Sequence, residues 1–175
     1  MATKDELTQQ AARLVSAAAK QAFGEWVSKV GDWKIFATVT LRDPESSGKR
    51  GTHSKPGWAA AMKASHQLIR LTEATQWCLV FEQHKERGVP HIHALLDSSW
   101  AIGEIDRLNS RFTDSATAAR VIDCQEVLYG YTGISRLKAY EAYRGADHYI
   151  GKYLRKEDSY LTMGTRSPGD KPAFW

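Results

Sequence analysis

Two histidines, His91 and His93, alternate with apolar residues in the segment His91–Leu96, whose composition predicts a β-strand. Alternate residues of a strand point to the same face, so both imidazoles are expected on one face. Such a pair can hold one metal ion, although the pattern also suits two solvent-facing or hydrogen-bonded histidines. Pro90 before the strand and the apolar residues that end it favour a rigid placement of the pair.

A third ligand has to come from a neighbouring strand, and Glu82 ends the preceding strand-like segment. Across a hairpin, its carboxylate would reach the same ion. Gln83 and His84 are rivals for this role, and a glutamate at a hairpin end is also typical of an ordinary charged flank. Two nitrogens and one oxygen suit Mg²⁺ or Mn²⁺, with Zn²⁺ as a further candidate, and leave coordination positions open for substrate oxygens.

Two tyrosines and two lysines recur in Asp147–Lys156. On a helix, Tyr149, Lys152, Tyr153 and Lys156 share one face. A tyrosine can attack a phosphodiester, and Lys152 could assist a phenol whose ordinary pKa is about 10. The alternative is a packed tyrosine pair whose lysines extend to water.

The surrounding segments predict an α+β fold in which helices flank a central antiparallel β-sheet. Apolar residues recur at helical spacing in four segments, and β-branched or alternating residues mark four strands. The expected helices are Asp5–Val30, Trp58–Ala74, Ile102–Phe112 and Arg136–Lys156; the expected strands are Trp33–Arg42, Trp77–Glu82, His91–Leu96 and Arg120–Val127. The charged segment Gln83–Pro90 is expected to close an antiparallel hairpin.

Composition restricts the class of protein. The 175 residues suit one domain, residues 1–175, with a helix of residues 5–30 packed on it, and exclude a barrel of eight βα units. The net charge of +4 agrees with a polyanionic partner. No segment is long and apolar enough for a membrane span, and Cys78 and Cys124 suit buried thiols in a reducing compartment, so a cytoplasmic location is expected and no membrane partner.

In this order, the motifs resemble the HUH endonuclease superfamily, and more closely its rolling-circle replication initiators from plasmids and single-stranded-DNA phages. The first motif is similar to Phe36–Leu41, the second to Pro90–Leu96 and the third to Tyr149–Tyr153, and the resemblance covers residues 34–156. Two tyrosines around a lysine resemble the two-tyrosine group. The resemblance implies the nuclease fold of these initiators, which is related to the ferredoxin-like fold.

The resemblance also implies a mechanism. His91, His93 and Glu82 would bind the metal, and Tyr149 or Tyr153 would attack single-stranded DNA at a replication origin. The products would be a 5′-phosphotyrosine bond and a free 3′-hydroxyl, and later strand transfer would rejoin the ends. Host replication proteins such as a helicase and a polymerase would be partners. In related initiators a glutamate stands in the place of Tyr149, so the order in which the tyrosines attack stays open.

Basic side chains near these motifs are candidates for DNA contacts. Arg155 and Lys156 follow the tyrosines, and Arg42 and Arg50 belong to a polar loop that could instead be merely solvated. Trp33 and Trp58 could stack on unpaired bases or belong to the core.

Other functions remain open. A single-tyrosine HUH transposase or a relaxase is the nearest alternative, although relaxases usually place their tyrosine near the N-terminus. A non-catalytic single-stranded-DNA-binding module would keep the fold without the chemistry. A metal-dependent hydrolase would use water as the nucleophile and form no protein–DNA adduct. The chain could also be the nuclease part of a longer initiator.

Overall fold

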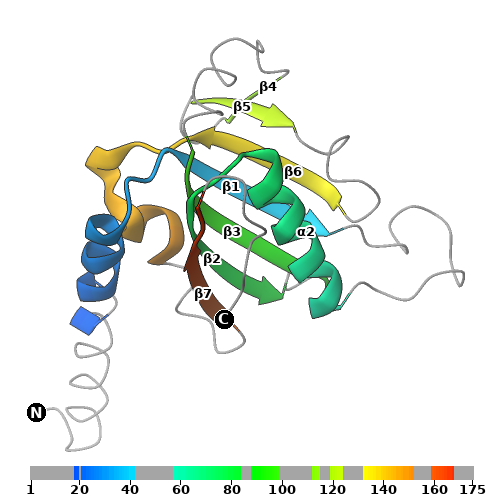
Figure 1. Cartoon of the computed structure of the whole chain (residues 1–175), viewed down its shortest axis with the longest axis horizontal. Helices are drawn as coiled ribbons and strands as arrows, with labels where there is room; N and C mark the ends of the chain where they lie inside the picture. Colours follow the sequence, from blue (N-terminus) through cyan, green and yellow to red (C-terminus); the bar gives the residue numbers. More distant parts are fainter. Residues whose placement is uncertain are drawn as a thin grey trace, which may run out of the picture.

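The computed structural model describes residues 18–19, 21–41, 57–83, 88–98, 112–114, 119–123, 132–151 and 159–167. Most of them belong to a single sheet and the elements that cover it (Figure 1). The strands are β1 (Ile35–Leu41), β2 (Gln76–Gln83), β3 (Pro90–Asp97), β4 (Phe112–Asp114), β5 (Ala119–Asp123), β6 (Thr132–Ala139) and β7 (Tyr160–Thr165). The helical elements are α2 (Trp58–Leu71), the 3₁₀ turn η2 (Ala142–Arg144), the π-helical turn η3 (Asp147–Gly151) and residues 21–30.

Seven strands form the sheet in the order β4-β5-β6-β1-β3-β2-β7, and every neighbouring pair is antiparallel. β1 lies between β6 and β3, two strands that come much later in the chain. Antiparallel pairing places directly opposite residues on the same face of the sheet. The register of β1, β2 and β3 therefore decides which side chains can meet.

One face of the sheet is covered by α2 (Figure 1). Its buried residues, among them Ala61, Ala64 and Leu68, recur at helical spacing and pack on apolar side chains of the central strands. Leu137 of β6 joins this core from the far side of β1. This face is apolar and excludes water.

The opposite face of the sheet is covered by helical residues 21–30 and by η3. Val27 from the helix and Ile150 from η3 are buried with Phe36 of β1 and Leu95 of β3. These covering elements meet the part of the face where β1 begins. The two faces thus differ in how they are covered, since the helix α2 lies over one face, whereas helical residues 21–30 and η3 cover only part of the other.

The predicted α+β fold with a central antiparallel sheet is confirmed. The strand at Trp33–Arg42 and the hairpin of Trp77–Glu82 with His91–Leu96 are present as β1, β2 and β3. The helix predicted from Trp58 ends at Leu71 because the chain turns at Glu73, whose φ is +50°.

The prediction of a helix beginning at Arg136 is wrong, because the chain continues as a strand to Ala139. Leu137, which pairs with Ala37, is buried against α2, whereas Arg136 and Lys138 pair with residues of the other face. β6 pairs with the edge of β1 that β3 leaves unpaired. The hydrogen bonds of this pairing therefore stabilise a strand, although the apolar residues also suit helical spacing.

Other expectations fall at the limits of the described residues. Phe112, the expected end of a helix, begins β4, and residues 102–111 lie outside the described part. The strand expected at Arg120–Val127 is described as β5, which ends at Asp123. The edge strand β7 was not expected, because its sequence YLTMGT mixes strand-forming residues with a glycine.

Candidate metal centre

The β2–β3 register brings the three predicted metal ligands together. Glu82 lies directly opposite His91, and His93 is the next residue of β3 on the same face. One ligand atom from each of the three side chains lies within 4.8 Å of those of the other two. Glu82 and His93 are 5% and 2% exposed, so solvent reaches the cluster mainly beside the half-buried His91.

The chemistry of this cluster fits a divalent cation. His93 Nε2 lies 3.5 Å from Glu82 Oε1, and the imidazole rings of His91 and His93 are 4.4 Å apart. Two imidazole nitrogens with one carboxylate oxygen suit Mn²⁺ or Zn²⁺, and Mg²⁺ less well, because Mg²⁺ prefers oxygen ligands. Three protein ligands leave room for oxygens of a substrate or of water.

β1 supplies a second layer of contacts behind the histidines. Thr40 Oγ1 lies 2.6 Å from His91 Nδ1, and Thr38 Oγ1 lies 3.4 Å from His93 Nδ1. The ring of Phe36 stacks on His93 at 5.9 Å with an interplanar angle of 5°. Sequence reasoning assigned no role to these threonines, although the alternation of Phe36, Thr38 and Thr40 in a predicted strand was a signal that they share one face.

The rival ligands do not join the described cluster. Gln83 follows Glu82 in β2 and therefore points to the opposite face. Its exposed side-chain amide donates a hydrogen bond to the carbonyl oxygen of Gly88 at 3.0 Å, which ties it to the hairpin connection. His84 lies outside the described residues.

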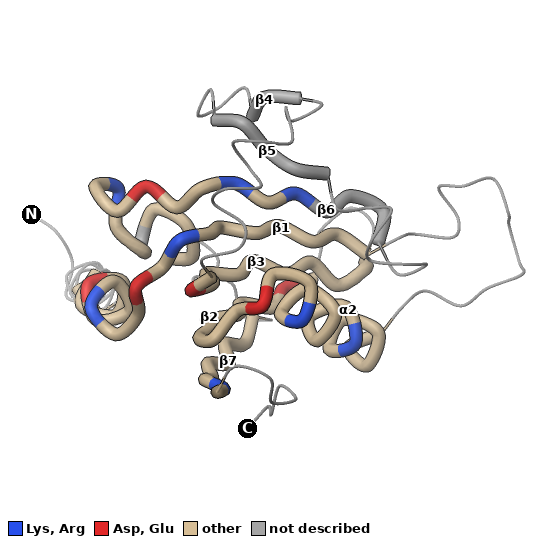
Figure 2. Tube along the Cα trace, turned by 45° about the horizontal axis from the view of Figure 1, so that its top comes forward, with Lys and Arg blue, Asp and Glu red and all other residues tan. Residues whose placement is uncertain are grey.

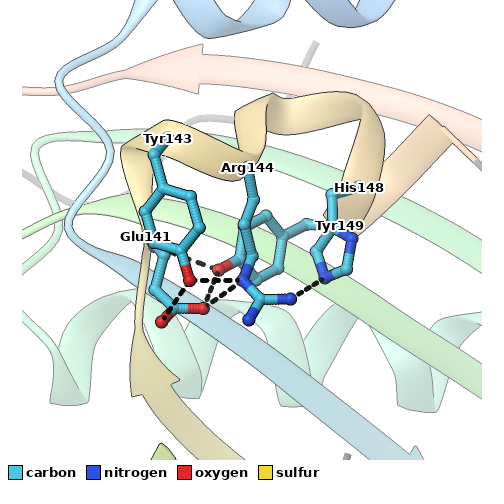
Figure 3. A network of polar contacts seen from close by, with 5 residues as sticks. All are labelled: Glu141, Tyr143, Arg144, His148 and Tyr149. Carbon is cyan, nitrogen blue, oxygen red and sulfur yellow. Dashed lines mark hydrogen bonds and ion pairs between the residues drawn. The ribbon is translucent and has the colours of Figure 1, made fainter. Parts of the chain in front are cut away.

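Tyr149 lies on the same face of the sheet but belongs to a different network (Figure 3). Its side chain is buried, and its ring is 4.9 Å from that of Phe36. Its hydroxyl accepts a hydrogen bond from the backbone N–H of Glu141 at 3.0 Å and donates to the Glu141 carboxylate at 3.3 Å. The same carboxylate accepts a hydrogen bond from Tyr143 and pairs with Arg144 at 2.5 Å.

This environment keeps the phenol of Tyr149 neutral. Burial raises its pKa to about 12, and the neighbouring negative charge of Glu141 acts in the same direction. The hydrogen bond from the Glu141 N–H and the charge of Arg144 act against this rise without cancelling it. In this arrangement the phenolate is costly, so attack by Tyr149 would need a base or a nearby cation.

The Tyr149 hydroxyl and the metal cluster lie toward opposite ends of β1. Glu141 follows the end of β6, where Ala139 pairs with Ile35, whereas His91 pairs with Thr40. At roughly 3.3 Å per residue, the rise from Ile35 is about 10 Å to Thr38, which lies opposite His93, and about 16 Å to Thr40. The structure therefore brings the ring of Tyr149 beside Phe36 and directs its hydroxyl to Glu141, not to the cluster.

Two basic residues of β6, a strand with blue segments in Figure 2, pair with residues of β1 on the face that carries the cluster. Arg136 is exposed and pairs with Thr38, which in turn pairs with His93. Lys138 pairs with Phe36, and its ammonium lies 5.4 Å from the centre of that ring. These cations were assigned to a helix in the sequence analysis, and the strand alternation that places them here was the missed signal.

Several predicted contact residues cannot be placed. Lys152, Tyr153, Arg155, Lys156, Arg42 and Arg50 lie outside the described residues, so their roles stay predictions. Of the two tryptophans considered for base stacking, Trp33 is 4% exposed and donates its indole N–H to the carbonyl oxygen of Val27, whereas Trp58 is 40% exposed. Only Trp58 of these two is open to a ligand.

Comparisons with protein-family models, with curated proteins and with solved structures find no match. The antiparallel sheet and the Glu–His–His cluster are compatible with the HUH motif. Within the described part of the chain, no helix has the length and apolar character needed to cross a membrane.

Proposed function

We propose that the chain is a metal-dependent HUH endonuclease that initiates rolling-circle replication. The observation that carries this proposal is the meeting of Glu82, His91 and His93 on two adjacent antiparallel strands, with His91 only half-buried. The order of the strand motif, the histidine pair and the tyrosines along the chain adds support. The proposed substrate is single-stranded DNA at a replication origin.

In the proposed reaction, Glu82, His91 and His93 would hold Mn²⁺ or Mg²⁺, and the ion would supply Lewis acidity toward a phosphodiester oxygen. The phenolic oxygen of Tyr149 or Tyr153 attacks phosphorus and loses its proton. The bond from phosphorus to the 3′-oxygen breaks, and that oxygen leaves as a 3′-hydroxyl after taking up a proton. The 5′-phosphate stays on the tyrosine, and a host polymerase, with a helicase opening the duplex, would extend the free end.

Two basic side chains on the face of the cluster suit a DNA strand. Arg136 and Lys138 on β6 offer positive charge there, and phosphate contacts of this kind give affinity without sequence preference. Trp58 is half-open, but it begins α2 on the opposite face of the sheet, so a base stacked on its ring would not lie beside the cluster.

Which tyrosine attacks is part of the proposal. For Tyr149 to serve, its hydroxyl must leave Glu141 and turn toward the cluster, which requires η3 to rearrange. Tyr153 lies outside the described residues, so the order in which the two tyrosines attack stays open.

A labelled adduct tests the proposal. The protein is incubated with Mn²⁺ and a pool of labelled single-stranded oligonucleotides, and denaturing electrophoresis detects label that migrates with the protein. We expect an adduct that EDTA and the double change Tyr149→Phe, Tyr153→Phe both abolish, whereas the control Tyr143→Phe keeps it. Persistence of the adduct in the double variant would contradict the tyrosine mechanism.

A second candidate function is a metal-dependent hydrolase that uses water as the nucleophile. It is favoured by one observation, the orientation of the Tyr149 hydroxyl away from the cluster. The same experiment separates the two functions. Metal-dependent cleavage that leaves ordinary ends and no adduct would establish water as the nucleophile and exclude the initiator mechanism.

A further inference from the structure

The side chains of β1 that face the metal cluster form a stripe of three residues, Phe36, Thr38 and Thr40. Each is paired with β3, and Thr38 and Thr40 lie directly opposite His93 and His91. Each threonine hydroxyl lies next to the Nδ1 atom of the histidine opposite, at 3.4 Å and 2.6 Å respectively. The same geometry thus occurs twice, on successive residues of one face.

These contacts bear on which ring nitrogen of each histidine carries the hydrogen. A neutral imidazole has one N–H, and the nitrogen that binds a metal must be the other one. A threonine hydroxyl can accept a hydrogen bond from Nδ1–H, which leaves the Nε2 lone pair available. For His93, Nε2 is also the atom that faces Glu82.

We infer that Thr40, and more weakly Thr38, are positioning residues that hold both imidazoles with the hydrogen on Nδ1 and with Nε2 directed to a shared cation. Their hydroxyls accept from Nδ1–H and fix the ring planes before the ion arrives. The stacking of Phe36 on His93 restrains the second ring further. This inference rests on the metal binding in the proposed function and assigns a task to β1 that neither the histidine motif nor the tyrosines perform.

The distances rank the two threonines. The contact of Thr40 with His91 is short and well within hydrogen-bond range, whereas that of Thr38 with His93 is near the limit. His91 is the more exposed of the two rings. Loss of the Thr40 hydroxyl should therefore matter more than loss of the Thr38 hydroxyl.

Valine and serine variants separate the hydroxyl from the shape of the side chain. Thr40→Val keeps the β-branched shape that suits a strand and removes the hydroxyl, whereas Thr40→Ser keeps the hydroxyl. Thr75→Val is the matched control, because Thr75 donates a side-chain hydrogen bond to Asp97 at 3.2 Å near the end of β3 remote from the cluster. Thermal unfolding of each metal-free variant checks that it is folded.

The first measurement is Mn²⁺ binding by electron paramagnetic resonance, without DNA. We expect Thr40→Val to raise the Kd for Mn²⁺ about 10-fold, within the range known for lost partners of metal-bound histidines. Thr38→Val should raise it by roughly 3-fold, and Thr40→Ser and Thr75→Val should stay close to the wild type.

The second measurement reads the hydrogen position directly. Ring ¹⁵N chemical shifts of the metal-free protein distinguish Nδ1–H from Nε2–H for each histidine. In the wild type, His91 should carry its hydrogen on Nδ1, and in Thr40→Val a mixture of the two forms should appear. A purely structural role of Thr40 would alter the unfolding temperature and leave both readouts unchanged.

Different outcomes overturn different statements. If the wild type binds Mn²⁺ and Thr40→Val binds it equally well, the positioning role is wrong and the metal site stands. An Nε2–H form of His91 in the metal-free wild type would also overturn the positioning role. If the wild-type chain binds neither Mn²⁺ nor another divalent cation, the proposed function fails, and the positioning role fails with it.

Discussion

The candidate metal site of Glu82, His91 and His93 and the Tyr149 network occupy the same face of one sheet, yet they are built in opposite ways. The cluster joins side chains of paired strands, with Thr40 and His91 separated by 51 residues in the chain. The network is local, since Tyr149 and Glu141 are only 8 residues apart and belong to turns. Its members Tyr143 and Arg144 are exposed or partly exposed. Sheet register therefore fixes the first site, whereas the second can rearrange without breaking the sheet.

The largest expected effect falls on the cluster. His93→Ala removes a buried ligand, and we expect the Kd for Mn²⁺ to rise at least about 100-fold, equivalent to roughly 2.8 kcal/mol. The control His66→Ala changes a histidine of α2, on the other face of the sheet, and should leave the Kd unchanged. A titration followed by electron paramagnetic resonance measures both. Unaltered Mn²⁺ binding by His93→Ala would contradict a metal site that depends on the register of the strands.

In Glu82→Gln, Mn²⁺ should no longer raise the free energy of unfolding. At Mn²⁺ about 30 times above Kd, the wild type should gain about 2 kcal/mol in the free energy of unfolding, and the variant should gain almost none. Without metal, the variant should be at least as stable as the wild type, because glutamine carries no charge into a position that is 5% exposed. Urea unfolding with and without Mn²⁺ measures this, and an equal metal-dependent gain in both proteins would contradict it.

Tyr149→Phe tests the second region at alkaline pH. The folded-state pKa of about 12 lies above the ordinary value of about 10, so the folded protein keeps a proton that the unfolded chain releases. The resulting stability is intact below pH 10 and is lost as the pH rises toward 12. The variant should lose about 1 kcal/mol at pH 7 through the missing hydrogen bonds, and its stability should decline less steeply above pH 10.

Urea unfolding at a series of pH values measures how the free energy of unfolding depends on pH in the wild type and in Tyr149→Phe. Tyr143→Phe, which alters a ring that is 79% exposed, is the control and should follow the wild type. Binding of Mn²⁺ at neutral pH should be unchanged in Tyr149→Phe, because the hydroxyl lies toward the other end of β1. A weakened metal site in this variant would show that the two regions are coupled.

The smallest effect is expected for Arg144→Met. The pair of Arg144 with Glu141 is partly exposed, with side chains 27% and 29% accessible, so its loss should lower the unfolding temperature only slightly. Thermal unfolding at two salt concentrations checks this. A decrease as large as that of Tyr149→Phe would mean that this surface pair holds the turn as firmly as the buried hydroxyl does.

The part of the site that the sequence predicted is the part governed by strand period and hairpin register. His91, His93 and Glu82 are neighbours because a period of two and one antiparallel turn suffice to bring them together. The contacts of Thr38 and Thr40 needed the β1–β3 register, which joins segments far apart in the chain. No local pattern specifies such a pairing.

The rest of the fold shows the same limit. The second half of β6, from Arg136, was predicted as a helix because Leu137 and its basic neighbours suit an amphipathic pattern of either kind. Only the pairing with β1 decides between the two. The orientation of Tyr149 depends on Glu141, a residue outside the motif that singled out the tyrosines. Whether Tyr153 and Lys152 share its face stays a prediction.

The β2–β3 hairpin and the pairing of β1 with β3 close loops of very different length, which favours an order in which these strands pair. Glu82, His91 and His93 all belong to β2 and β3, whose pairing closes a short loop and forms on the microsecond scale. β1 must close a much longer loop before Thr40 can reach His91, which favours later docking. A cation captured by the early hairpin would be held loosely at first. Its binding would tighten when β1 docks, so metal in the medium would favour the docking of β1 over its release.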